Sequence, residues 1–403
     1  MALTPVAEAL AAALGGIVPT EVERVALAAA NGRVLAEDLV ALRTQPPFDA
    51  AAMDGWALVA ADAAAPGARL TVIGESAAGR GFTGRVTPGT CVRIFTGAPV
   101  PNGADTVEMQ ENTTREGDTV VFNAEVRPNR HIRRAGIDFR EGMVGLAAGT
   151  RLDFTNLGLV AAMNHAEVAV RRRPRIAVLA TGDELVPPGT VPGPDQIIAS
   201  NGYGITALIE AVGGEPVDLG IVRDDLDATV AAIEAGFARG IDALVTIGGA
   251  SVGDHDHVHA ALAACGVDFG FWKLAMRPGK PLMFGRRGAT RVLGLPGNPV
   301  AALVCSLLFV APLVRALAGL GEPVGAPETV FLGGTVGPND VRQDYLRARL
   351  VVDEAGRLVA VPADLQDSSL LSRFASTDGL IVRPPHAPAA GPGDRVPFLR
   401  FPR

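Results

Sequence analysis

Cysteine is scarce in this 403-residue chain, which holds three. Cys91, Cys265 and Cys305 lie far apart, show no C-x-x-C spacing and have apolar neighbours. A disulfide framework is therefore excluded, and buried thiols in a reducing compartment are expected. No Ser/His/Asp or Cys/His nucleophile pattern occurs either, so the chemistry does not require a covalent intermediate.

A basic tail or lysine-rich face is also missing. The net charge is -7 and the isoelectric point is about 5.5, which disfavours binding to nucleic acid by counterion release. The densest basic run, Arg171 to Arg173, precedes Pro174 and is interpreted as a linker at a domain entry. Nucleic acid is therefore not expected as a partner.

Long uninterrupted apolar runs are absent as well. The longest, Val300 to Val314, contains Pro312 and ends at Arg315, whereas a helix needs about 20 apolar residues to cross a bilayer. No membrane partner is expected, and the protein is predicted to be cytoplasmic.

The beginning of the chain shows no cationic leader and is predicted to be helical. Thr4 and Pro5 are expected to be the N-cap and the first residue of a helix that ends at Leu14, because proline is favoured in the first helical turn.

What is present is the composition of a globular protein with two to four domains, 48% hydrophobic and 20% charged. Residues 175–327 alternate short apolar strands with helical periods, which predicts an α/β domain with a doubly wound, mostly parallel sheet covered on both faces. Strands are expected at 175–180, 217–222, 243–245 and 291–295, and helices at 201–212 and 226–238.

The flanking regions predict an elongated multidomain molecule. Short alternating runs between glycines and prolines predict a small β-rich domain over residues 46–139. Residues 1–45 together with 140–174 are assigned to a helical or mixed region. Residues 328–403 are predicted to form a small C-terminal β-barrel or sandwich.

A glycine-rich loop, Thr246 to Asp256, follows the expected strand at 243–245. Its backbone N–H groups can surround an anion, and its aspartates can hold a cation. A carboxylate about 4 Å from a phosphate is unfavourable by roughly 4 kcal/mol at an effective dielectric near 20. A divalent cation between them would reverse that sign. The alternative is a surface turn with solvated aspartates.

A second loop, Pro296 to Pro299, connects a strand to the long apolar run. Asn298 is placed as the N-cap and Pro299 as the first helical residue, so the helix would direct unpaired N–H groups and its positive dipole end toward this loop. An anion is the expected occupant. The alternative is a strand-to-helix turn with no ligand.

Charged residues accompany these loops. Lys273, Arg277 and Lys280 can neutralise an oxyanion. Glu184 and Asp224 follow other strands of the same sheet and offer oxygen ligands to Mg²⁺. Each would be an ordinary surface charge if it stood alone.

Histidines near the glycine-rich loop raise a rival interpretation. His255, His257 and His259 alternate with Asp256 close by, and imidazoles with a carboxylate can bind zinc or iron. On a helix only His255 and His259 would share a face, so the oxygen-ligand interpretation is preferred.

The N-terminal half contains compact turns with Asp54 and Thr96, followed by an arginine-rich segment with Arg134 and Asp138. Individually these are explained as turns and solvated arginines.

Taken together, these segments resemble the molybdopterin molybdenumtransferase family, whose animal relative is the C-terminal domain of gephyrin. The resemblance runs from Pro46 to Leu380 through PPFDAAAMDG, IFTGAPVPNGADTVEMQE, HIRRAGID, ATGDEL, SNG, GIVRDD, GGASVGDHD, FWKLAMRPGKP, GLPGNPVAA and QDSSLLSRF. It implies a molybdopterin-binding α/β domain over residues 175–327. It also implies an enzyme of molybdenum cofactor biosynthesis that converts adenylylated molybdopterin and molybdate into molybdenum cofactor and AMP.

The resemblance also implies roles for individual residues. Mg²⁺ is expected on Asp224, Asp256 and Glu184. The catalytic residues implied are Asp54, Thr96, Asp138, Glu184, Asp224, Asp256, Lys273 and Arg277. The binding residues implied are Gly248, Gly249, Ser251, Gly253, Lys280, Pro296, Gly297, Asn298, Pro299, Arg134 and Ser368.

Partners follow from the same source. The family implies an elongated homodimer, in which residues 1–45 and 140–174 dimerise and the α/β domain of one chain faces the small β domain of the other. Molybdopterin adenylyltransferase and molybdoenzyme-maturation proteins are the further partners expected.

Several positions depart from the family pattern, among them Ile247, Ala199 and Asp367, and Arg277 stands where lysine is usual. These departures leave open a paralogue that inserts tungstate. Two further alternatives are a molybdopterin adenylyltransferase, whose fold is similar to residues 175–325, and a non-catalytic gephyrin-like scaffold.

Overall fold

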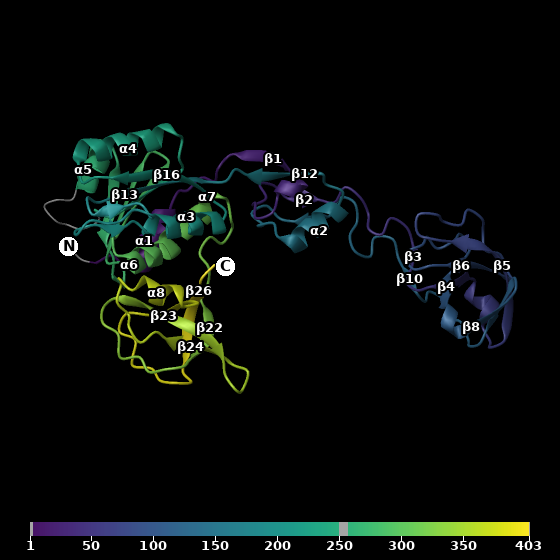
Figure 1. Cartoon of the computed structure of the whole chain (residues 1–403). Coiled ribbons are helices and arrows are strands. Elements are labelled where there is room, and N and C mark those ends of the chain that lie inside the picture. The colour runs from purple at the N-terminus through teal and green to yellow at the C-terminus, as the bar shows by residue number, and fades with distance from the viewer. Residues whose placement is uncertain (1–2, 250–256, 403) are drawn as a thin grey trace.

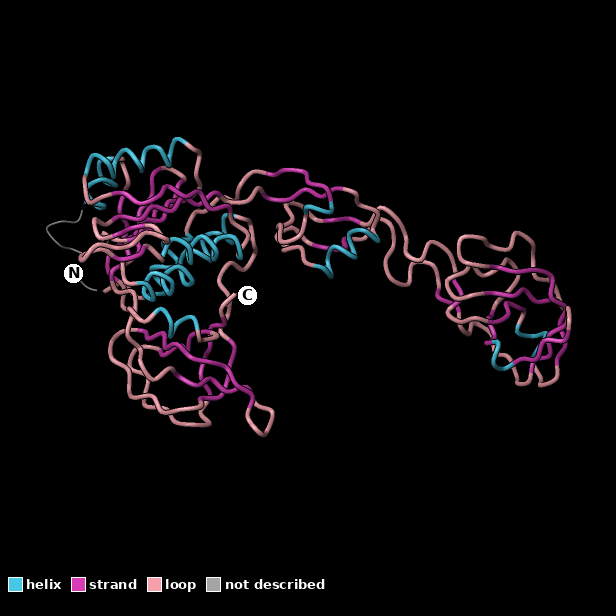
Figure 2. Tube along the Cα trace, in the orientation of Figure 1, coloured by secondary structure: helices cyan, strands magenta, loops and turns pink. Residues whose placement is uncertain are grey.

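The computed structural model describes residues 3–249 and 257–402. The molecule is elongated, with an α/β domain and a C-terminal barrel at one end and an extended N-terminal arm that ends in a mixed sheet (Figure 1). The expectation of an elongated multidomain architecture is confirmed. Figure 2 shows that the helices are concentrated in the α/β part, whereas the far end of the arm is built mainly of strands and loops.

The α/β domain is built on a six-stranded sheet in the order β16-β13-β17-β21-β20-β18. The three pairs among the first four strands are parallel and the two pairs that follow are antiparallel. The sheet is thus mostly parallel, as predicted. Its strands are β13 (Arg175–Thr181), β16 (Glu215–Val222), β17 (Ala243–Ile247), β18 (Asp268–Lys273), β20 (Pro281–Arg287) and β21 (Thr290–Leu295).

Alternate side chains of these strands are buried on opposite faces, because successive residues of a strand point to opposite sides. Ile176 and Val178 pack on one face against α3 (Asn201–Ala211), α6 (Pro299–Cys305) and α7 (Ala311–Leu317). Ala177 and Leu179 pack on the other face against α4 (Leu226–Ala238) and α5 (His257–Ala264). The doubly wound arrangement predicted from the sequence is confirmed.

One long apolar helix runs from Pro299 to Leu317 and includes a π-helical turn over Ser306–Val310. The wider turn precedes Pro312, which has no N–H to donate, so the helix continues through a proline that was expected to interrupt it. By length and composition it could span a bilayer, with mean hydropathy 2.3, but 72% of its most apolar window is buried inside the protein. This helix is therefore part of the hydrophobic core of the α/β domain.

The first helix belongs to the α/β core. α1 (Val6–Leu14) buries Val6, Ala9 and Ala13 in the core cluster that contains α6 and α7. The prediction that Thr4 caps this helix was wrong. Pro5 is the N-cap, and Thr4 forms a β-bridge with Leu274 and donates its backbone N–H to Lys273 O at an N···O distance of 2.8 Å.

The N-terminal arm leaves and re-enters the α/β domain at one point. Thr20 Oγ1 donates to the carbonyl oxygen of Arg172 at 2.6 Å, and β1 (Val22–Ala26) pairs antiparallel with β12 (Glu167–Arg171) directly beyond this contact. Further out the arm contains α2 (Phe154–Ala162), the pair β2 (Leu39–Val40) with β11 (Val144–Leu146), and the pair β3 (Ala50–Ala51) with β10 (Ile132–Arg133).

The far end of the arm is a six-stranded mixed sheet in the order β7-β4-β6-β5-β9-β8. Only the pair β5 with β6 is parallel among its pairings. The strands are β4 (Gly55–Leu58), β5 (Ala68–Ser76), β6 (Thr90–Ile94), β7 (Thr106–Met109), β8 (Thr113–Glu116) and β9 (Thr119–Phe122).

The C-terminal part closes into a five-stranded barrel, because the sheet order β23-β24-β22-β26-β25 is completed by pairing of β23 with β25. The two-residue strand β19 (Met276–Arg277) adds to β23 from the α/β domain. The barrel strands are β22 (Glu328–Leu332), β23 (Gln343–Val352), β24 (Leu358–Pro362), β25 (Gly379–Arg383) and β26 (Arg395–Arg400), and α8 (Leu371–Ala375) lies between β24 and β25 in the chain.

The three cysteines are buried free thiols, as predicted. Burial raises the pKa of Cys91 to about 12 and that of Cys265 to about 11, and it raises the pKa of Cys305 as well. At pH 8 we expect none of the three to react with a thiol reagent such as DTNB in the native protein, and all three to react after unfolding in guanidinium chloride.

The same shifts give the direction of a pH effect. Above about pH 8.5 the unfolded chain begins to lose thiol protons that the folded chain retains. The contribution of these thiols to stability is therefore complete below that pH and is lost as pH rises toward 11–12. One thiol that reacts within seconds in the native protein at pH 8 would contradict this prediction.

Candidate functional site

A cavity of about 820 Å³ lies at the carboxyl ends of β13, β16, β17 and β21. The chain passes from β13 to its neighbour β16 and then to β17 on the other side of β13, so the strand order reverses between β13 and β17. Ligands of open α/β sheets bind at such a reversal point. The sheet topology therefore places the cavity where a substrate is expected.

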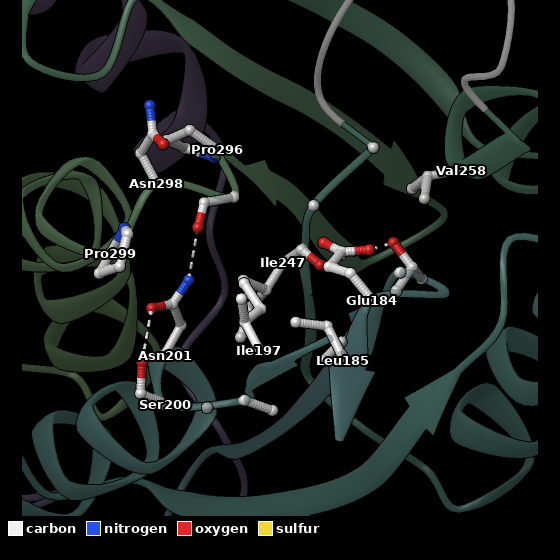
Figure 3. A pocket seen from close by; sticks show the side chains of 18 of the residues that line it. Glu184, Leu185, Ile197, Ser200, Asn201, Ile247, Val258, Pro296, Asn298 and Pro299 are labelled. Carbon is white, nitrogen blue, oxygen red and sulfur yellow. Dashed lines mark hydrogen bonds between the residues drawn. The ribbon is translucent and has the colours of Figure 1, made fainter. Parts of the chain in front are cut away.

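Eight predicted site residues line this cavity. They are Glu184 after β13, Asp224 after β16, Gly248 and Gly249 after β17, and Pro296, Gly297, Asn298 and Pro299 after β21. Figure 3 shows Asn298 and the two prolines on one side of the cavity and Glu184 on the other, with Ile247 between them. Carboxylates and a helix N-terminus thus border one space.

The two glycine-bearing loops touch each other. Gly248 N donates to Leu295 O at 3.1 Å, and a Cβ built on Gly297 would lie 3.9 Å from the Cα of Gly248. Gly248 has φ +92°, and a Cβ there would lie 2.7 Å from the carbonyl oxygen of Thr181. Glycine is required at 248 because both the backbone conformation and this close approach exclude a side chain.

Asn298 is the N-cap of α6 and Pro299 is in its first turn, as predicted. Only part of the helix N-terminus is open to a ligand, because Val300 N already donates to Ser368 O at 3.0 Å. The predicted binding residue Ser368 therefore contacts this helix through its carbonyl group, and its neighbour Ser369 lines the cavity.

Asn201 is a cavity residue that was not assigned from the sequence. Its Nδ2 donates to Gly297 O at 2.8 Å (Figure 3). The side chain therefore ties the first residue of α3 to the loop after β21. The S-N-G string at the helix start was the available signal, since Asn at a helix start commonly makes side-chain hydrogen bonds.

An apolar wall completes the cavity and was also missed. The short parallel pair β14 (Leu185–Val186) with β15 (Ile197–Ile198) contributes Leu185, Ile197 and Ile198, and Ile247 lines the cavity from β17. Ile197 is 57% exposed. Apolar lining with a few polar groups that orient the ligand is typical of small-molecule sites.

The segment that carries Lys273, Arg277 and Lys280 lies at the rim of the cavity, and none of these three residues lines it. β18 pairs antiparallel with β20, and Lys273 is opposite Pro281, which does line the cavity. Lys273 and Lys280 are the only lysines in the chain. Every lysine ammonium of the molecule is therefore carried by this segment.

Arg277 is held by the barrel. Its guanidinium forms an ion pair with Asp344 and lies 3.9 Å from Asp340. Its hydrogen bond to Asp344 is the main cause of its raised pKa. This arginine therefore links the segment after β18 to the barrel strand β23.

Arg347 in β23 is a further residue that the sequence did not single out. Its side chain is 1% exposed, its Nη2 donates to Asp367 O at 3.1 Å, and burial lowers its pKa. Its Nε has no hydrogen-bond partner within the part of the chain that the structure describes. No local pattern marks an arginine inside a strand as buried.

Asp367, one of the departures from the family pattern, is engaged locally. Its Oδ1 accepts hydrogen bonds from Ser369 N at 2.8 Å and Ser369 Oγ at 2.6 Å, and the side-chain hydrogen bond is the main reason that its pKa is lowered. Its carboxylate therefore fixes the turn that presents Ser369.

The predicted residues of the N-terminal half belong to the arm: Asp54 precedes β4, Thr96 follows β6 and Arg134 follows β10, and these strands lie at the end of the arm away from the α/β domain (Figure 1). Thr96 N and Oγ1 both donate to Asp54 Oδ1 at 2.7 Å, and the backbone bond is the main cause of the lowered pKa of Asp54. Arg134 pairs with Asp49 at 2.6 Å, and Asp138 N donates to Gln45 O.

Some of the residues that were predicted to bind the metal ion or the substrate are not described by the structure. Ser251, Gly253 and Asp256, and with them His255, lie outside the described residues. Within residues 3–249 and 257–402, no group of three His, Cys, Asp or Glu side chains is arranged to hold a metal ion. His257 lines the cavity, while His259 stacks on Phe269 with ring centroids 4.3 Å apart.

Comparison with known proteins decides the family. The chain matches the MoeA N-terminal region (domain I and II) over residues 4–164, a probable molybdopterin binding domain over 177–316 and the MoeA C-terminal region (domain IV) over 335–401. It is 36% identical to the molybdopterin molybdenumtransferase of Haemophilus influenzae over 370 residues, 90% of each chain. The chain belongs to the molybdopterin molybdenumtransferase family.

Other relatives agree with this membership. The molybdopterin molybdenumtransferase of a Nostoc species is 40% identical over 314 residues, 75% of this chain and 72% of the relative. The crystal structure of a molybdopterin biosynthesis MoeA protein from Pyrococcus horikosii superimposes with a TM-score of 0.82 at 30% identity, covering 99% of both chains. The family therefore covers all the parts of the fold described above.

Proposed function

We propose that the cavity binds adenylylated molybdopterin together with molybdate, and that the protein inserts the metal with release of AMP. Molybdate insertion in molybdenum cofactor biosynthesis is the activity for which the family is named. The observation that carries the proposal is the meeting of Glu184, Asp224 and the glycine loops at the reversal point of the sheet.

The size and chemistry of the cavity support this substrate. A volume of about 820 Å³ is near the upper end of the roughly 300–1,000 Å³ usual for small-molecule sites. The wall of Leu185, Ile197 and Ile247 suits flat rings, whereas the loops beginning at Gly248 and Pro296 offer backbone N–H groups to phosphate oxygens.

Two described carboxylates fit Mg²⁺, which is usually held by one or two carboxylates together with substrate phosphate oxygens. Glu184 and Asp224 would hold it, and Asp256 is the third ligand proposed. When bound, the ion would neutralise phosphate charge as the adenylyl bond breaks. Lys273 and Lys280 at the rim would attract molybdate, while the ion pair to Asp344 holds Arg277 and orients the segment that carries both lysines.

A homodimer would complete the site. Asp54, Thr96, Arg134 and Asp138 do not line the cavity of their own chain, and β4, β6 and β10 next to the first three lie at the far end of the arm (Figure 1), so the arm of a second chain would supply these residues. Exposed apolar side chains on the arm support such pairing. They are Val40, Leu42, Met143, Val144 and Phe154, the last 85% exposed.

The cellular setting is proposed on the same grounds. Three buried free thiols suit the reducing cytoplasm. A substrate that arrives adenylylated implies the adenylyltransferase as a partner upstream, and molybdoenzyme-maturation proteins would receive the product.

The proposed reaction is tested with purified full-length protein, adenylylated molybdopterin, Mg²⁺ and molybdate. We expect AMP release that depends on molybdate and consumes no ATP. ATP consumption without added adenylylated substrate would instead identify an adenylyltransferase. If neither activity is detected, the result supports a non-catalytic scaffold. Tungstate in place of molybdate, at equal concentration, compares the two metals.

A further inference from the structure

Six arginines surround a small cavity where the N-terminal arm joins the α/β domain, at the opposite end of β13 from the proposed active site. They come from the arm, from the connection to β13 and from the end of α7. They are Arg33, Arg151, Arg171, Arg172, Arg173 and Arg315.

Carboxylates neutralise only part of this charge. Arg33 pairs with Glu23, and Arg172 pairs with Glu21 at 2.8 Å and with Asp242 at 3.0 Å. Against six positive charges these are three negative ones, which leaves the cluster at +3. Like charges held this close repel each other unless an anion lies among them.

The remaining guanidinium groups face backbone carbonyls. Arg151 donates to Ala211 O at 3.2 Å, Arg171 to Thr20 O at 3.0 Å and Arg315 to Pro323 O at 3.4 Å. Over the described ranges, no carboxylate lies within 4.0 Å of these three side chains or of Arg173. Each guanidinium has five N–H donors, so most of their donors remain available.

Burial increases the cost of this repulsion. The pKa of Arg315 is lowered, first by burial and then by the positive charge of Arg151. Arg151 itself lies beside Gly32, where a built Cβ would be 3.8 Å from its Nη2. The arginine from α7 and the arginine from the arm therefore act on each other across the junction.

The cavity has a volume of about 20 Å³, and about 10–15 Å³ is enough for one water-sized group. It can admit a single oxygen of a tetrahedral anion while the other oxygens face the arginines at its mouth. A nucleotide base or a peptide side chain would not enter. Planar guanidinium groups bind such oxygens in pairs.

We propose that this arginine cluster binds a doubly charged tetrahedral oxyanion of the phosphate, sulfate or molybdate type, and that the anion fixes the arm to the α/β domain. Arg33, Arg151 and Arg171 contact it from the arm, and Arg315 contacts it from α7. Because the arm joins the α/β domain at this point (Figure 1), the anion sets the direction of the arm.

Titration calorimetry with sodium sulfate, at constant ionic strength set with sodium chloride, tests the proposal. The full-length Lys273→Ala protein is the reference, because it lacks one of the lysines at the rim of the proposed active site. In that background we expect Arg151→Gln and Arg315→Gln each to weaken sulfate binding roughly tenfold, the loss of one charge-assisted hydrogen bond. Arg349→Gln, an exposed arginine of the barrel, is the matched control and should bind as the reference does.

Two further measurements locate the anion and identify its source. Crystals soaked in tungstate should show anomalous density within hydrogen-bond reach of Arg151 and Arg315. Parallel titrations with phosphate and molybdate rank the anions. Equal sulfate affinity in all variants, or no density at the cluster, would overturn the proposal. Loss of sulfate binding as the protein concentration rises would also overturn the proposal, since carboxylates of a second copy would then cover these arginines.

Discussion

The Asp224→Asn protein is expected to release AMP about 10²- to 10³-fold more slowly than the unchanged protein, the usual loss when one preorganised electrostatic group is removed from an active site. Asp224 is one of two described carboxylates that line the cavity. Asparagine keeps the shape of the side chain and removes its charge. Rates should be measured across Mg²⁺ concentrations, and the variant should need more Mg²⁺ for half-maximal rate.

Folding should be unaffected by this change. Asp224 is exposed, and its backbone N–H donates to Asp183 Oδ1 at 3.3 Å. Asparagine at position 224 retains this hydrogen bond. Asp195→Asn is the matched control, because Asp195 is exposed in the same domain and does not line the cavity. A rate within threefold of the unchanged protein, with the same Mg²⁺ dependence, would remove Asp224 from the proposed site.

Gly55→Ala is expected to destabilise the mixed sheet of the arm by at least about 3 kcal/mol, beyond the usual range for overpacking a core. A Cβ at Gly55 would lie 1.8 Å from the carbonyl oxygen of Glu108 and 2.8 Å from its carbon. These are backbone atoms of β7, which pairs with β4, so no side chain can swing away. The two strands must separate.

Hydrogen exchange measured by mass spectrometry separates a local from a global effect. Peptides that contain β4 and β7 should lose protection, while those that contain β13 and β17 should keep it. Thr96 and Asp54, next to Gly55, should lose their contact, so AMP release should fall as well. Gly158→Ala in α2 is the control, because a Cβ there meets nothing within 4 Å. In a helix that change should be neutral or stabilising by up to about 1 kcal/mol.

Much of the α/β domain could be predicted from the sequence because its signals are local. The helix expected over 226–238 has those bounds in the structure, with the Asp225 side chain accepting a hydrogen bond from Ala228 N at 2.8 Å at its start. Glu184, Asp224 and the two loops could be grouped without coordinates, since the carboxyl ends of parallel strands meet at one edge.

Strand order and long-range contacts could not be predicted in this way. Lys273 ends β18, which is two strands away from β21 in the sheet, so it reaches the rim and not the lining. The ion pair of Arg277 with Asp344 joins residues 67 positions apart, and the burial of Arg347 depends on the loop before α8. The continuity of the helix through Pro312 depends on a π-helical turn that no residue pattern announces.

The contact of Thr20 with Arg172 has a consequence for how such a molecule is put together. The arm comprises about 150 residues, and its first and last residues lie next to each other because Thr20 is hydrogen-bonded to Arg172. Helix α1, which precedes the arm in the chain, is part of the α/β core. Joining ends that already touch adds little loop-closure entropy. The arm is therefore an insertion that could become longer or shorter, or be exchanged, without change to the α/β domain that carries it. The length and stiffness of the arm can then vary independently of the cavity in the α/β domain.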